Sequence, residues 1–99
     1  MRTEYLIRCK IERGGFNSER TFEIELPDGC KLVGVAFVEH LLDENKGPLD
    51  EDTPGYGEQI EGFVKCRRIR QIDEQKVLIE VPSSDVIHVP NDELLPLNE

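Results

Sequence analysis

Apolar and polar residues alternate along most of this chain, and this period of two is its strongest structural constraint. In the first such segment Tyr5, Ile7, Cys9 and Ile11 lie on one face, and mostly charged residues lie on the other. A strand with one buried face has this pattern, whereas a helix needs a period near 3.6. The sequence therefore predicts a mostly β protein, and residues 1–99 form a single domain by length.

Further segments repeat the pattern and are separated by residues typical of turns. Strands are expected near 22–26, 77–81 and 86–89, and Pro27-Asp28-Gly29 predicts a tight hairpin turn. The alternation in 59–72 loses phase near Arg67-Arg68, which a one-residue β-bulge would restore. The residues expected to be buried are Ile7, Cys9, Phe22, Ile24, Val35, Val64, Val77, Ile79 and Val89.

The segment 31–38 is apolar on both faces. Such a run is typical of a central strand that is covered on both sides, although its apolar residues also fit a helical period. We expect a strand here that gives way to a short helical turn near 39–45. The turn would end at Lys46-Gly47-Pro48, an order of residues typical of helix ends.

Five or six short antiparallel strands cannot cover both faces of an open sheet, so the sheet is expected to curl. The expected fold class is all-β: a small antiparallel β-barrel of five to six strands with a short helical turn and a long acidic loop. The late part of the chain has a long loop, then two hairpins of decreasing length, then a short helical turn. This order of elements resembles an SH3-like barrel. Three meandering strands, a helix and two further strands instead resemble an oligonucleotide-binding (OB-like) barrel. Both resemblances concern layout alone and carry over no functional residue.

The negative charge is concentrated in one segment. The chain has a net charge of −9, and residues 39–61 carry eight acidic residues against one lysine. Residues 44–58 lack periodicity and have only Leu49 and Tyr56 as apolar anchors, which predicts a mobile loop. The leading hypothesis is a non-catalytic adaptor that binds a basic protein partner. Its candidate partner-binding residues are Asp50, Glu51, Asp52, Tyr56 and Glu58.

The same loop comes close to a calcium-binding pattern. Asp50, Asp52, Gly55 and Glu61 have the spacing of a twelve-residue calcium loop. Pro54 stands where a third oxygen ligand is needed, and no flanking helices are expected. The sequence therefore favours a solvated acidic loop, with no metal and no cofactor.

A basic cluster supplies the alternative function. Lys65, Arg67, Arg68 and Arg70 could bind anions and follow a nucleic-acid backbone. Pairing with carboxylates on neighbouring strands is the favoured interpretation, with Glu23, Glu25 or Glu80 as partners. Because the net charge of the whole chain repels phosphates, a nucleic-acid partner is the second hypothesis.

Catalysis and metal binding find little support in the remaining residues. The three cysteines are expected to be buried, reduced thiols, and Cys9 and Cys66 fall on inward-facing positions. His40 and His88 have no spacing that would join the cysteines in a zinc site, and His88 is expected to be exposed. There is no apolar run long enough for a membrane span and no secretory signal, so we expect a cytoplasmic protein. The oligomeric state stays open.

Overall fold

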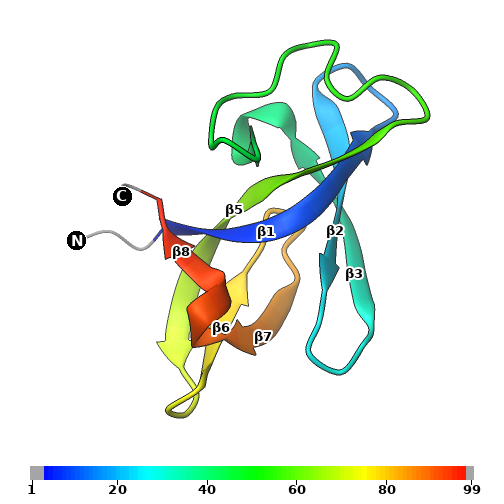
Figure 1. The fold of residues 1–99 in the computed structure, drawn as a ribbon. Coiled ribbons are helices and arrows are strands. Elements are labelled where there is room, and N and C mark those ends of the chain that lie inside the picture. Colours follow the sequence, from blue (N-terminus) through cyan, green and yellow to red (C-terminus); the bar gives the residue numbers. More distant parts are fainter. Residues whose placement is uncertain (1–3, 98–99) are drawn as a thin grey trace.

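The computed structural model describes residues 4–97, which form one antiparallel sheet that curls into a half-barrel (Figure 1). The expectation of an all-β, small barrel-like fold is thereby confirmed. Two short 3-10 turns, η1 (Val38–His40) and η2 (Asn91–Glu93), interrupt the strands. The strands are β1 (Glu4–Arg13), β2 (Glu19–Glu25), β3 (Lys31–Phe37), β4 (Leu41–Asp43), β5 (Gln59–Gln71), β6 (Lys76–Glu80), β7 (Val86–Pro90) and β8 (Leu94–Pro96).

The six longer strands follow the order β3-β2-β1-β5-β6-β7. Strands β1, β2 and β3 form one meander, and β5, β6 and β7 form the other. The two meanders are joined by the ladder between β1 and β5, which runs from Glu4–Arg67 to Glu12–Gln59. The three-residue strands β4 and β8 pair with β5 and β1. The alternation of the sequence thus produces one twisted surface whose concave side is apolar.

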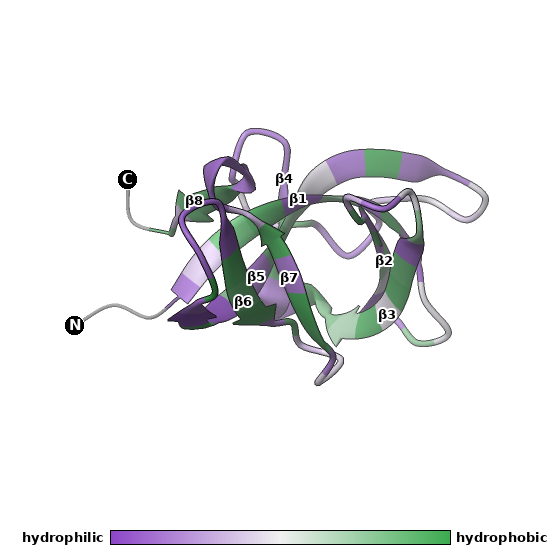
Figure 2. Ribbon diagram, turned by 90° about the horizontal axis from the view of Figure 1, so that it is seen from below, coloured by the Kyte–Doolittle hydropathy of each residue, from purple (hydrophilic) through white to green (hydrophobic). Residues whose placement is uncertain are grey.

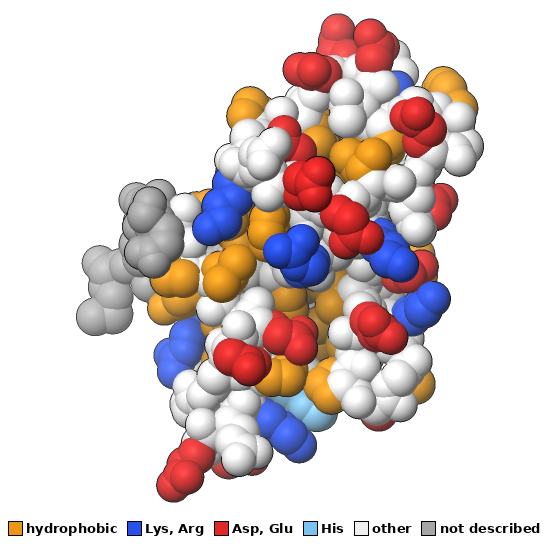
Figure 3. Space-filling model, viewed as in Figure 1, with side chains coloured by type: hydrophobic (Ala, Val, Ile, Leu, Met, Phe, Trp, Pro, Cys, Tyr) orange, Lys and Arg blue, Asp and Glu red, His pale blue; other side chains and the backbone are white. Residues whose placement is uncertain are grey.

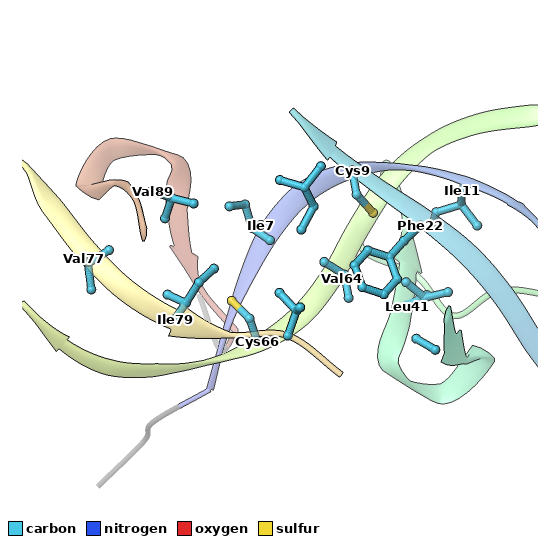
Figure 4. Packing of buried hydrophobic residues seen from close by; sticks show 13 residues of the cluster. Ile7, Cys9, Ile11, Phe22, Leu41, Val64, Cys66, Val77, Ile79 and Val89 are labelled. Carbon is cyan, nitrogen blue, oxygen red and sulfur yellow. The ribbon is translucent and has the colours of Figure 1, made fainter. Parts of the chain in front are cut away.

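The core fills this concave side with residues from both meanders (Figure 4). Eight of the nine residues expected to be buried are at most 4 % exposed, and Val35 is half exposed. The bulge is also confirmed: Arg68 lies opposite Ile79 and Arg70 opposite Leu78, so Ile69 is the additional residue. Local periodicity therefore identified the inner face of almost every strand.

The expectation that 31–38 forms a central strand is wrong. Within the described part of the chain β3 pairs only with β2 and lies at the edge of the sheet. Gly34 and Ala36 face the core, whereas Val33, Val35 and Phe37 are 58 %, 50 % and 52 % exposed. A strand that is apolar on both faces can occupy the centre or an edge, and the pattern alone does not distinguish the two positions.

The helical turn expected at 39–45 is also corrected. The chain makes the short turn η1 and then the strand β4, in which Leu41 is buried opposite Val64 of β5. The carboxylate of Asp43 then accepts the backbone N–H groups of Asn45 and Gly47, both at 2.8 Å. Pairing with β5 and this side-chain cap stabilise an extended segment followed by a tight turn.

Two buried residues lie outside the inward-facing set. Leu6 lies opposite Leu95 of β8 and is fully buried. The ring of Phe63 on β5 is 4.9 Å from the guanidinium of Arg8 and 5.9 Å from the ammonium of Lys46. Long basic side chains thus cover part of the convex side of the sheet.

Candidate functional site

The structure of the acidic loop depends on Arg20, which points toward the concave side of β2. Arg20 has the same phase as Phe22 and Ile24 and is completely buried. Within residues 4–97 its guanidinium donates hydrogen bonds of 2.7 to 3.2 Å only to main-chain carbonyl oxygens. These acceptors belong to Asn17, Glu19, Asp50, Glu51 and Thr53.

The Arg20 cation is neutralised by dipoles rather than by a carboxylate. Burial and the nearby Arg13 cation lower the pKa of Arg20 from its ordinary value, but a guanidinium keeps its charge at neutral pH. Buried charge needs compensation, and five carbonyl oxygens provide it. Arg20 therefore binds Asp50 and Glu51 through their carbonyl oxygens and does not occupy their carboxylates.

A second arginine contacts the loop from the end of β1. The Nη1 atom of Arg13 donates a hydrogen bond to the carbonyl oxygen of Glu51 at 2.7 Å. The Arg13 guanidinium also lies 5.0 Å from the ring centre of Tyr56, which is 79 % exposed. The loop is closed internally by Glu58, whose Oε1 accepts the backbone N–H of Gly55 at 2.7 Å.

The structure brings the five candidate partner-binding residues together in one projecting loop. Asp50, Glu51, Asp52, Tyr56 and Glu58 are all exposed. Acidic side chains gather at the top of Figure 3, where the loop lies in Figure 1. Arginines bind the carbonyl oxygens of Asp50 and Glu51, and Arg20 also binds that of Thr53, the residue after Asp52. The three acidic side chains themselves are exposed.

The anchors of this loop differ from those expected from the sequence. Leu49 packs against the core as expected, but Tyr56 is exposed, and the loop is instead held by Arg20 and Arg13. Pro54 is also buried. The mobility of residues 44–58 stays a prediction. Among residues 4–97, no three His, Cys, Asp or Glu side chains gather as metal ligands would.

The four basic candidates of β5 do not form a continuous free surface. Arg67 donates two hydrogen bonds to Oε1 of Glu80, at 2.6 and 3.1 Å, so Glu80 is the partner among the three expected. Arg68 donates to the Gln71 side chain at 3.1 Å, and the bulge separates it from Arg70. Lys65 is half-buried on the same strand. The Arg67–Glu80 pair is exposed and contributes about 0.2 to 1 kcal/mol.

The cysteines differ in their surroundings. Cys9 and Cys66 are buried, and burial raises the pKa of each thiol to about 12. Cys30 is exposed after the turn at Gly29, which corrects the expectation that all three thiols are buried. The negative charge of Asp28 raises the pKa of Cys30. His88 is exposed, as expected.

A groove that the sequence did not reveal crosses the front of the molecule in Figure 3. Its volume is about 720 Å³, and it lies between β1, the turn after β2, and η2. Its rim carries both signs of charge, from Arg8, Lys10, Glu25 and Glu93. The groove lies where β2 and β8 separate, since β2 pairs with residues 10–13 of β1 and β8 pairs with residues 5–7. The local sequence pattern does not predict this arrangement.

Comparison with known proteins gives no relative: no family model, no curated protein and no solved structure matches the chain. In residues 4–97 there is no helix with the length and apolar character that crossing a membrane requires.

Proposed function

We propose that this protein is a non-catalytic binding module that presents its acidic loop to a basic segment of a protein partner. The observation that carries the proposal is the way in which Arg20 holds the loop. Because its guanidinium binds the carbonyl oxygens of Asp50 and Glu51, the backbone of these two residues is held without loss of their carboxylates. A preorganised cluster of free charges binds with a smaller loss of conformational entropy than a flexible one.

The distribution of charge supports a basic partner. Most of the net charge of −9 lies in residues 39–61, so its field has a direction. Such a field speeds the approach of an oppositely charged partner and is screened by salt. The exposed ring of Tyr56 adds an apolar contact that salt does not screen.

The test measures binding of a Lys- and Arg-rich peptide by calorimetry at two salt concentrations. The variant Asp50→Asn, Glu51→Gln, Asp52→Asn is expected to weaken binding at least about tenfold. Its matched control, Glu74→Gln, Asp92→Asn, Glu93→Gln, changes the net charge equally, and these three residues are also exposed. Equal weakening by both variants would show that only net charge matters and would overturn the proposal.

A nucleic-acid partner predicts the opposite results in a parallel titration. For mixed oligonucleotides at low salt, removing the loop acids would tighten binding, and Arg67→Ala with Arg70→Ala would abolish it. Since Glu80 already neutralises Arg67, we expect no tight oligonucleotide binding by the wild type. Sub-micromolar affinity for oligonucleotides would defeat the proposed function.

A further inference from the structure

The edge strand β3 combines exposed apolar side chains with a backbone edge that pairs with no other strand among residues 4–97. Leu26 N–H donates to Cys30 O, and Val38 N–H donates to Ser18 O, both at 2.8 Å. Even-numbered positions of this strand therefore direct their backbone groups toward β2, because the direction alternates along an antiparallel ladder. The N–H and C=O groups of Val33, Val35 and Phe37 consequently point away from the sheet.

This edge lacks the features that usually prevent strand addition. Natural edge strands carry central charges, prolines or bulges, and most are short. β3 has seven residues with a regular register to β2, and its one charged residue is Lys31 at the start. Figure 2 shows β3 as a predominantly hydrophobic strand at the border of the sheet. Such an exposed strand is typical of an interface.

We propose that β3 is a self-association edge, at which two copies of this chain pair antiparallel about a two-fold axis at Val35. In this register Val33 lies opposite Phe37 of the second copy, and Val35 lies opposite itself. Lys31 then lies level with Glu39, an exposed residue of η1 in the second copy. Apolar residues meet apolar ones and the flanking charges are opposite, so the sequence of β3 complements itself.

The position of the acidic loops is compatible with this pairing. Arg20, which holds the loop, lies opposite Ala36 near the end of β3. Antiparallel pairing places the loops of the two copies at opposite ends of the joint β3 ladder, which limits their repulsion. A seven-residue strand pair buries little area, so the dimer is expected to be weak. This inference does not depend on the proposed function of the loop.

The first experiment is sedimentation equilibrium from about 10 µM to about 1 mM protein. The wild type is expected to form dimers, and Val35→Lys is expected to lower the association constant at least about tenfold. Ile72→Lys is the matched control, since it introduces the same charge at an aliphatic residue that is 44 % exposed and lies outside β3. A monomeric wild type, or equal association of both variants, would overturn the proposal.

A second experiment tests the register without depending on the folding of Val35→Lys. On a Cys30→Ser background, Val35→Cys should form a disulfide-linked dimer, because facing residues have Cα atoms about 5.5 Å apart. Val33→Cys is the control: its two copies would be offset by four residues, about 13 Å. Cys9 and Cys66 are buried and leave the background low. Cross-linking of Val33→Cys at the rate of Val35→Cys would exclude this pairing.

Discussion

The carbonyl oxygen of Asp50 accepts a hydrogen bond from the buried guanidinium of Arg20 at 3.2 Å, while the side chain of Asp50 is exposed. The backbone of this residue therefore holds the loop, and its carboxylate remains available. The carbonyl oxygen anchors the backbone of the loop and the carboxylate carries its charge. Substitutions can therefore remove the anchor and the charge separately.

Arg20→Met should loosen the loop and keep its acids. The change leaves five carbonyl groups without their donor, and we expect the free energy of unfolding to fall by about 2 to 4 kcal/mol. Arg13→Met is the control, with a single hydrogen bond lost and an expected decrease of about 0.5 to 1 kcal/mol. Urea denaturation measures both values, and limited proteolysis should detect new cleavage at 50–54 in Arg20→Met. Equal effects of the two substitutions would contradict the anchoring role of Arg20.

Gly34→Ala should destabilise the contact between β3 and the turn that follows β6. A Cβ atom at Gly34 would lie 2.7 Å from Oγ of Ser83 and 2.8 Å from the ring of Phe22. Overpacking of this kind typically costs about 1 to 3 kcal/mol. At Gly15 an added Cβ has no neighbour within 4 Å, so Gly15→Ala is the neutral control. Thermal unfolding that shows no difference between the two variants would refute this close approach.

Two aliphatic residues of the apolar strands should respond differently to truncation. Ile79→Ala creates a cavity in the core and should lower the free energy of unfolding by about 2 to 5 kcal/mol. Val35→Ala removes methyl groups that are half exposed and should change it by less than about 0.5 kcal/mol. Both values follow from chemical denaturation at a low protein concentration, where association does not contribute. A large loss for Val35→Ala would place β3 inside the sheet.

Alkylation should modify Cys30 alone in the native protein, and slowly. The thiolate is the reactive form, and the charge of Asp28 raises the pKa of Cys30, so less thiolate is present at a given pH. Asp28→Asn should therefore lower that pKa and accelerate alkylation below it, and the rates should converge at higher pH. Asp73→Asn serves as the control in another turn. Mass spectrometry gives the rates, and a slower reaction of Asp28→Asn would contradict this assignment.

Most of the strands could be predicted because the alternation that specifies a buried face is local. Ile7, Phe22 and Ile79 each occupy the apolar phase of their own strand, and the bulge could be inferred from the loss of phase. The position of β3 could not be predicted, since the partners of a strand are decided by residues far away in the sequence. Leu6 was likewise buried by β8, whose pairing is non-local.

Composition alone predicts the acidic loop, but not the hydrogen bonds that hold its backbone. A signal for Arg20 existed: it occupies the same phase as Phe22 and Ile24, where a charged residue requires buried partners. Those partners are carbonyl oxygens, which every residue possesses, so the sequence cannot indicate which ones are used. Of the carboxylates expected to pair with the arginines, Glu80 lies on β6 next to β5, whereas Glu23 and Glu25 lie on β2, which does not neighbour β5.

The ladder between β1 and β5 has a kinetic consequence. Within each meander, short turns connect the paired strands. Across the ladder between β1 and β5, the hydrogen-bonded side chains of Glu12 and Gln59 are 47 residues apart in the sequence. Loop-closure entropy opposes this step until many pairs form together, so the docking of the two meanders should limit the folding rate. The chain between β3 and β5, which contains the acidic loop, links the two meanders covalently. Two fragments divided there would each retain a meander and could reassemble through that ladder.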